Sequence, residues 1–328
     1  ALELGDVQVG SGTLTVSGTG ITQATGSTIT QAAGAGAAQF NAGAGVLQLD
    51  SANTFTGAVS LNNSGNHDVT LDNGTHALTL GTSTLGSGTF SLEGTGQTTL
   101  AGNLTTTGGA ITLSGPVALG SPTTGINTTG GGATAGAAIT FSGALDGASG
   151  LTLDAGTAGA VTLAGTVGGT TALTGLTVTA GSFSANALNI GGGLSVTTRA
   201  GDITQGGAGA FKVAGTSNFT AMNGHAITLD NTDNDFQDAV TATGTGVSIT
   251  AHDDLTIDTL NNGSNGTVSL IAGGALLLPT GAIDTGTADL TLAANGGTLT
   301  APGALSGANV TLSSQGDITL SDAVKATG

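Results

Sequence analysis

The residues best suited to chemistry in this sequence are aspartates that gather in one short stretch. The stretch contains Asp230, Asp233, Asp235 and Asp238, and Asp253 and Asp254 follow it. Carboxylate oxygens are the ligands that Ca²⁺ prefers, so the first four aspartates are a candidate Ca²⁺ site. Their spacing fits neither the EF-hand loop nor the G-G-x-G-x-D nonapeptide, and Asp also shapes turns by bonding nearby backbone. We expect turn chemistry here, and no obligatory cofactor.

Histidine, the other common metal ligand, is sparse in this chain. The four histidines, His67, His76, His225 and His252, are isolated from one another and stand beside Asn, Asp, Gly or Thr. A metal site needs two or more such ligands to converge in space. We therefore expect these histidines to lie in loops.

Catalytic side chains are equally scarce. The basic residues are Arg199, Lys212 and Lys325, and the glutamates are Glu3 and Glu93. Polysaccharide lyases and hydrolases on parallel β-helices need several carboxylates with Arg or Lys on one face. The P-loop, G-x-S-x-G and H-E-x-x-H motifs are missing from the sequence. We expect no enzyme, and no catalytic or cofactor-binding residues.

The composition points away from several other classes of protein. The 328 residues include 61 glycines, no cysteine and only 7% charged residues, and the net charge is −17. An acidic surface repels nucleic-acid phosphates and anionic lipids, so neither is an expected partner. No apolar run reaches the ~18 residues of a membrane-spanning helix. Apolar residues nevertheless recur regularly, which is not the pattern of a disordered chain.

A short repeat organises the whole sequence. An apolar residue, then Thr or Ser, then another apolar residue recurs along the chain. In the C-terminal third the triplets begin at Ile227, Val247, Val268, Leu290 and Val310, which are 20, 21, 22 and 20 residues apart. Offset copies fill the intervals, so each repeat contains two or three short strands. Between them lie turn-forming residues, as in Asp72-Asn73-Gly74 and Asn261-Asn262-Gly263.

Strand geometry converts this repeat into a fold. Alternation places both apolar side chains of a triplet on one face and the Thr on the other. Such short strands bury their apolar face only when the chain coils and each strand stacks on its equivalent one turn away. We predict an all-β, right-handed parallel β-helix (β-solenoid) of about 20 residues per turn. Roughly 16 turns would make 1–328 a single rod about 75–80 Å long.

Two features interrupt the simple repeat. The stretch 127–138 lacks an apolar triplet and contains a glycine run, which predicts a loop that leaves the rod; a bulged turn or a joint between two rods are the alternatives. A longer similarity relates Leu49–Val59 to Leu229–Val240, and an Ile-Thr-Gln triplet precedes each copy. We interpret this as a duplicated block around 21–59 and 203–240. The glutamines and asparagines could stack into amide ladders along the rod.

The duplicated block carries a family resemblance. The strings G-D-I-T-Q at 201–205, N-F-T at 218–220, I-T-L-D-N at 227–231 and N-D-F at 234–236 resemble the repeats of filamentous-haemagglutinin-like adhesins. These are large secreted β-helical exoproteins of the two-partner secretion type. The resemblance implies a secreted or cell-surface location, an outer-membrane export partner, and a structural or adhesive role toward host or neighbouring cells. The family's N-P-N-G-type secretion motif is absent, so the segment would belong to the shaft.

Two other functions find weaker support in the sequence. The first is a carbohydrate-binding or carbohydrate-processing β-helix, which usually needs exposed aromatic residues; the chain has only eight Phe, and several stand at inward strand positions. The second rests on T-x-T motifs, as at 13–15, 28–30, 54–56 and 298–300, which resemble the faces of β-helical ice-binding proteins. Such faces need the motif in register on many consecutive turns, and in the sequence it is scattered. The simpler interpretation is that Thr suits an exposed strand position.

The ends of the sequence show no capping helix or charge cluster. A solenoid end without a cap exposes unpaired strand backbone. We therefore expect the first and last turns to pair with further turns of the same chain, or with identical chains end to end.

Overall fold

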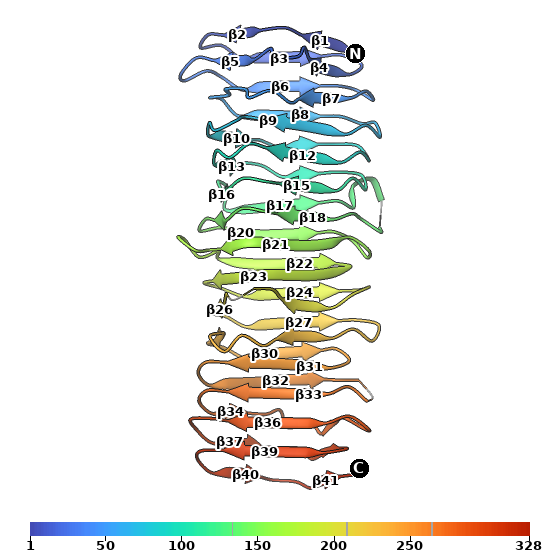
Figure 1. Cartoon of the computed structure of the whole chain (residues 1–328), viewed down its shortest axis with the longest axis vertical. Helices are drawn as coiled ribbons and strands as arrows, with labels where there is room; N and C mark the ends of the chain where they lie inside the picture. The colour runs from blue at the N-terminus through green and yellow to red at the C-terminus, as the bar shows by residue number, and fades with distance from the viewer. Residues whose placement is uncertain (133, 208, 264) are drawn as a thin grey trace. The chain divides into compact units, whose positions relative to one another are not determined.

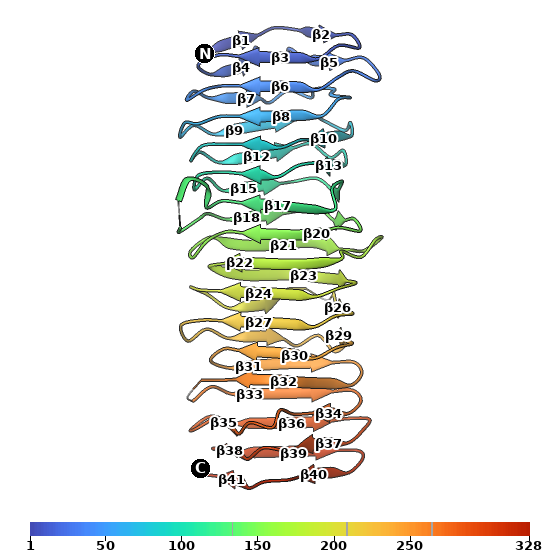
Figure 2. The same cartoon turned by 180° about the vertical axis from the view of Figure 1, so that it is seen from behind.

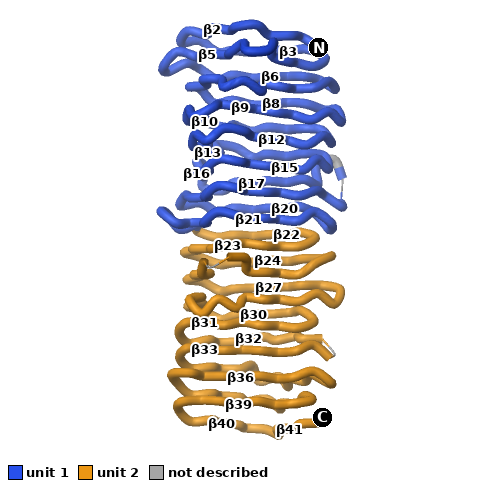
Figure 3. The backbone as a smooth tube through the Cα atoms, in the orientation of Figure 1, with its two compact units in different colours: residues 1–173 blue, residues 174–328 orange. Residues whose placement is uncertain are grey.

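The computed structural model describes residues 1–132, 134–207, 209–263 and 265–328. The chain divides into two compact units, Ala1–Leu173 and Thr174–Gly328, which Figure 3 shows in different colours. Both units are parallel β-solenoids, with about 15 turns in all and about 22 residues per turn (Figures 1 and 2). The predicted fold class is confirmed. The prediction of a single rod over 1–328 stays a prediction.

Unit 1 consists of strands that stack in parallel in three series. The first series is β1 (Leu2–Leu4), β4 (Ile21–Gln23), β7 (Leu47–Leu49), β9 (Val69–Asp72), β12 (Phe90–Glu93), β15 (Ile111–Leu113), β18 (Ile139–Phe141) and β21 (Ala160–Val167). The second is β2 (Val7–Val9) with β5 (Ile29–Gln31), and further along β10 (Leu78–Leu80), β13 (Thr98–Leu100), β16 (Val117–Leu119) and β19 (Leu145–Asp146). The third is β3 (Leu14–Ser17), β6 (Ala38–Asn41), β8 (Val59–Asn62), β11 (Ser83–Thr84), β14 (Leu104–Thr105), β17 (Thr123–Asn127) and β20 (Gly150–Asp154).

Unit 2 follows the same plan with longer strands. Its first series is β23 (Ser182–Ile190), β25 (Ile203–Gln205), β28 (Ile227–Leu229), β31 (Val247–Ala251), β33 (Val268–Ala272), β36 (Leu290–Ala294) and β39 (Val310–Ser314). The second is β26 (Phe211–Val213) with β29 (Asp235–Phe236), then β34 (Leu276–Leu277), β37 (Leu299–Ala301) and β40 (Ile318–Leu320). The third is β22 (Gly175–Ala180), β24 (Leu194–Thr198), β27 (Ser217–Ala221), β30 (Val240–Thr243) and β32 (Leu255–Asn261), and then β35 (Ile283–Asp284), β38 (Leu305–Gly307) and β41 (Val324–Ala326).

The register matches the triplet spacing read from the sequence. Each of Ile227, Val247, Val268, Leu290 and Val310 is the Cα partner of the next. The apolar residues of these triplets point inward and most are buried, whereas the intervening Thr and Ser are half-buried or exposed. Phe40, Phe90, Phe141 and Phe211 occupy the inward positions expected of them. The core of each unit is therefore a continuous apolar column that the turns build together.

The mean turn is longer than the predicted 20 residues because loops differ in length. From Ile111 to its partner Ile139 the chain takes 28 residues, since this turn contains the stretch 127–138. That stretch connects β17 to β18 and includes a short 3₁₀ helix, η1 (Gly130–Gly132). The described part of it is held to the next turn, because the backbone N–H groups of Thr157 and Ala158 donate to the carbonyls of Thr134 and Ala135. Residue 133, within the predicted loop, lies outside the described residues.

Helix is almost absent from this fold. In the described ranges, η1 is the only helical element, and no helix is long and apolar enough to span a bilayer.

Candidate functional site

The predicted Ca²⁺ cluster is spread over several turn positions of unit 2. Asp230 Oδ1 accepts a 2.6 Å hydrogen bond from Ser248 Oγ, and Asp238 Oδ1 accepts one of 2.7 Å from the backbone N–H of Ala239. Asp235 Oδ2 accepts a 3.1 Å bond from Gln237 Nε2, and its Cα partner is Lys212. These carboxylates thus accept hydrogen bonds from neighbouring side chains and backbone.

Two of these aspartates meet the later pair at one groove. Asp235 and Asp238 line a hollow of about 490 Å³ together with Asp253 and Asp254, whereas Asp230 and Asp233 do not line it. Asp254 is itself engaged, because its Oδ1 accepts a 2.7 Å bond from the backbone N–H of Ala275. Among the described residues, no three His, Asp or Glu side chains adopt an arrangement that could hold a metal ion. Calcium binding stays a prediction.

The four histidines are distributed over separate turns. His225 Nδ1 lies 3.3 Å from Asp202 Oδ1, and His252 Nδ1 lies 3.0 Å from Asp253 Oδ1. His76 Nδ1 lies 3.5 Å from Thr54 Oγ1. These three histidines each lie beside a neighbouring polar group, and among the described residues no histidine belongs to a cluster that could hold a metal ion.

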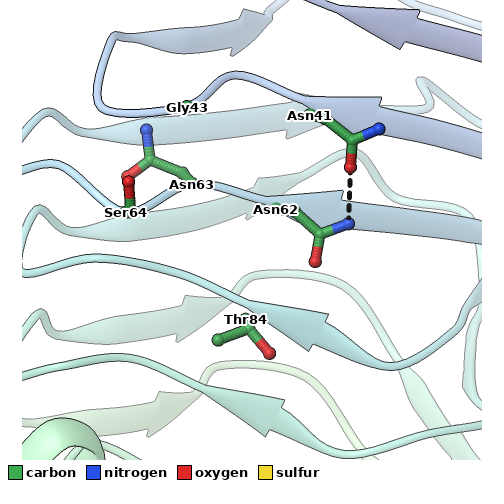
Figure 4. Close-up of a pocket in the computed structure, with 6 residues that line it drawn as sticks. All are labelled: Asn41, Gly43, Asn62, Asn63, Ser64 and Thr84. Atoms are coloured by element: carbon green, nitrogen blue, oxygen red, sulfur yellow. Dashed lines mark hydrogen bonds between the residues drawn. The ribbon is translucent and has the colours of Figure 1, made fainter.

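An outward amide ladder runs along the third series of unit 1. Asn62 Nδ2 donates a 3.0 Å bond to Asn41 Oδ1 on the preceding turn, and Asn41 Nδ2 donates one of 3.2 Å to Ser17 Oγ. Figure 4 shows Asn41 and Asn62 in this relation beside Thr84. Asn41, Asn62 and Thr84 line a shallow groove of about 320 Å³. Amide stacking between turns was expected from the sequence, and here the asparagines provide it.

The glutamines of two Ile-Thr-Gln strands do something different: they form buried amide pairs. In unit 1, Gln23 Nε2 donates to Asn53 Oδ1 at 2.8 Å, and Asn53 Nδ2 donates back to Gln23 Oε1 at 3.0 Å. In unit 2, Gln205 and Asn234 exchange the same two bonds at 2.7 and 2.9 Å. We call each reciprocal pair an amide clasp.

Each clasp is embedded in the same set of backbone bonds. Asn53 Oδ1 also accepts from the N–H of Ile29, and Asn234 Oδ1 accepts from that of Phe211. The Nδ2 groups donate to the carbonyls of Leu49 in one unit and Leu229 in the other. Both asparagines are fully buried. The clasp therefore satisfies backbone groups of neighbouring turns that would otherwise be buried without partners.

A pair of phenylalanines accompanies each clasp. Phe40 and Phe55 meet edge to face with ring centroids 5.8 Å apart, and Phe219 and Phe236 do the same at 6.1 Å. Edge-to-face contact is a favoured geometry for aromatic rings in a core. The duplication inferred from the sequence is thus a duplication of clasp and aromatic pair. The glutamine and the asparagine of each clasp are visible in the sequence, but nothing in the sequence indicates that their side chains contact each other.

A comparison with protein-family models agrees with this duplication, whereas no curated protein and no solved structure matched the chain. Residues 1–62 and 168–243 match a family model described as repeats of unknown function (DUF5649). The first matched segment holds Gln23, Asn53 and their phenylalanine pair, and the second holds Gln205, Asn234 and theirs. The two segments that resemble this repeat family are the segments in which clasp and aromatic pair recur.

Proposed function

We propose that this chain is a structural and adhesive shaft segment of a secreted bacterial surface fibre, and that it performs no catalysis. The observation that carries the proposal is the continuous apolar core of each unit. Every turn contributes inward residues, and each turn contacts mainly its neighbours, so such an architecture gains length by adding turns without altering the existing ones. A repeating scaffold of this kind suits a spacer between a cell and a distant contact.

The secreted location and the outer-membrane export partner rest on the resemblance to filamentous-haemagglutinin-like exoproteins. Antibodies raised against residues 1–328 should label intact, unpermeabilised cells or the culture medium of the producing bacterium. Labelling that requires permeabilised cells would contradict the location and leave the shaft architecture unaffected.

The partners that we propose include further turns or other copies of this chain, besides a ligand on host or neighbouring cells. Successive turns of each unit pair through parallel strands, so a further turn or a second copy of the chain would pair in the same way.

One experiment separates a shaft from a carbohydrate-processing β-helix. The purified chain is incubated with a panel of polysaccharides, and released sugar ends are measured; beads coated with the chain are tested in parallel for adherence to cells. We expect adherence and no polysaccharide turnover. Turnover of any polysaccharide would overturn the proposal, and an absence of adherence would remove the adhesive role.

A further inference from the structure

The outward residues of five stacked strands in unit 2, β22, β24, β27, β30 and β32, form two parallel columns. The first column holds Thr177, Ser195, Asn218, Thr241 and Thr259, and the second holds Thr179, Thr197, Thr220, Thr243 and Asn261. Within a column each residue is the Cα partner of the next. All ten carry a hydroxyl or an amide and none carries a charge, in a chain whose net charge is −17. We call these ten positions the hydroxyl face.

The hydroxyl face has a fixed backbone. Between its columns the inward residues Val178, Val196, Phe219 and Ala242 are all buried. The register shifts once, between Val240 and Thr241, where β32 contains one extra residue. Thr241 still pairs with Thr259. The buried column therefore holds the outward hydroxyls at a regular spacing.

Most polar groups of this face are left free for an external ligand. In the ranges that the structure describes, the side chains of the ten positions make two hydrogen bonds: Asn261 Nδ2 donates to Thr243 Oγ1 at 3.3 Å, and Thr259 Oγ1 donates to Asp258 Oδ2 at 3.4 Å. The first series of unit 2 differs, because Ser248 Oγ donates to Asp230 and Thr204 Oγ1 donates to the carbonyl of Phe183. A hydroxyl both donates and accepts hydrogen bonds, as water does.

The size of the hydroxyl face argues against a protein partner. Five turns spaced by ~4.8 Å, with two columns ~6.7 Å apart, present on the order of 300 Å². A stable protein interface needs about 800 Å² from each partner. The face also has no outward aromatic ring of the kind that stacks on sugars.

We propose that the hydroxyl face binds ice. Spacings of ~4.8 Å along the columns and ~6.7 Å between them are close to the two oxygen repeats of the prism face of hexagonal ice. A hollow of about 290 Å³ lies against Thr177, Ser195 and Asn218. Water ordered there by the hydroxyl grid would merge with the lattice of a growing crystal.

The test compares two double variants on the same two turns of unit 2. Thr197→Lys with Thr220→Lys places two charged side chains on the hydroxyl face. The control, Thr204→Lys with Thr228→Lys, makes the same change at stacked outward positions of β25 and β28. The fluorescently labelled chains are exposed to a slowly growing ice hemisphere, and ice recrystallisation is followed. Far-UV circular dichroism and thermal melting establish that both variants are folded.

We expect the unmodified chain and the control to enter the ice and slow recrystallisation, and the hydroxyl-face variant to lose both effects. The proposal is overturned if the unmodified chain is excluded from ice, or if both variants lose the effect equally. Should the hydroxyl-face variant not fold, Thr197→Val with Thr220→Val replaces it and removes the hydroxyls without adding charge. Ice binding does not rest on the shaft function, because a stable solenoid that fails to bind ice remains a candidate shaft.

Discussion

The side-chain amides of Gln205 and Asn234 face each other at the edge of the core of unit 2 and exchange two hydrogen bonds, of 2.7 and 2.9 Å. The two residues are 29 positions apart, so the pair ties one turn to the next. The same pair forms between Gln23 and Asn53 in unit 1. Because an asparagine buried in this way accepts and donates to several backbone groups at once, we infer that the clasp fixes the path of the chain between strands.

Removal of one clasp should loosen the turns that it joins. Asn234→Ala removes the acceptor of the Phe211 N–H and both hydrogen bonds to Gln205, which costs about 1–3 kcal/mol. We expect faster hydrogen exchange at the Phe211 amide, together with a lower unfolding midpoint. Asn218→Ala, at an exposed position, serves as the control and should change stability by less than about 0.5 kcal/mol. Equal effects of the two substitutions would contradict a role for the clasp.

Glycine at a turn corner should be required where stacked backbones approach closely. A Cβ added at Gly86 would lie 1.7 Å from the carbonyl oxygen of Gly65 on the preceding turn, so Gly86→Ala must displace backbone. We expect a loss of about 1–3 kcal/mol, as for overpacking elsewhere. Gly12→Ala is the matched control, because a Cβ there meets nothing within 4 Å. Urea unfolding measures the stability of both variants. An unchanged stability of Gly86→Ala would show that these two turns do not approach each other so closely.

The fold was predictable because its signals are local and repeated. The triplets that begin at Val69, Phe90 and Ile111 recur every 21 residues, and the structure stacks them directly on one another. Glycine at a left-handed turn position was also readable: Gly74 and Gly263 have φ of 59° and 64°. The mean length of a turn was underestimated because loops such as 127–138 carry no periodic signal.

The candidate surfaces were harder to predict from the sequence than the fold, because they depend on which turns become neighbours. Members of the first column of the hydroxyl face are 18, 23, 23 and 18 residues apart, so no fixed period reveals them. Ser195 and Asn218 also replace Thr, which hides the T-x-T pattern. The T-x-T motifs noticed in the sequence, such as 298–300, lie outside this face. The aspartates of 230–238 were adjacent in sequence, yet only Asp235 and Asp238 line the same groove.

Acid should weaken the turn at Asp68. The backbone N–H of Thr89 donates to Asp68 Oδ1 at 2.8 Å, and this bond, helped by the Thr89 hydroxyl and by His67, lowers the pKa of the carboxyl. Folding thus favours the ionised form, so the stabilisation is complete at neutral pH. It is lost below about pH 4, as the pH falls through the lowered pKa.

Carboxyl chemical shifts followed by NMR between pH 6 and pH 2 measure this directly. Asp68 should titrate below the usual range, and Asp68→Asn should make the thermal midpoint less dependent on pH over the acidic window. An Asp68 that titrates at or above its ordinary pKa would rule out the proposed bond.

Calcium should make little difference to the fold. The carboxylates of Asp230 and Asp238 already accept bonds from Ser248 and from the Ala239 backbone, and these bonds shape the turns without a metal. We expect EDTA to leave the far-UV circular dichroism unchanged at neutral pH, and added Ca²⁺ to shift the thermal midpoint little. A collapse of the β signal in EDTA would show instead that the aspartates of 230–238 hold a structural ion.

The central claim is that each turn presents alternate residues to a shared core and to solvent, and neighbouring positions in β36 test it most directly. Leu292 is fully buried between Leu270 and Leu312, whereas Thr291 faces outward between Ser269 and Thr311. Leu292→Asp buries an unpaired carboxylate and should cost several kcal/mol, unfolding local turns in urea or on heating. Thr291→Asp should melt close to the unmodified chain. Equal sensitivity of the two positions would contradict the solenoid register, and with it the shaft that the register builds.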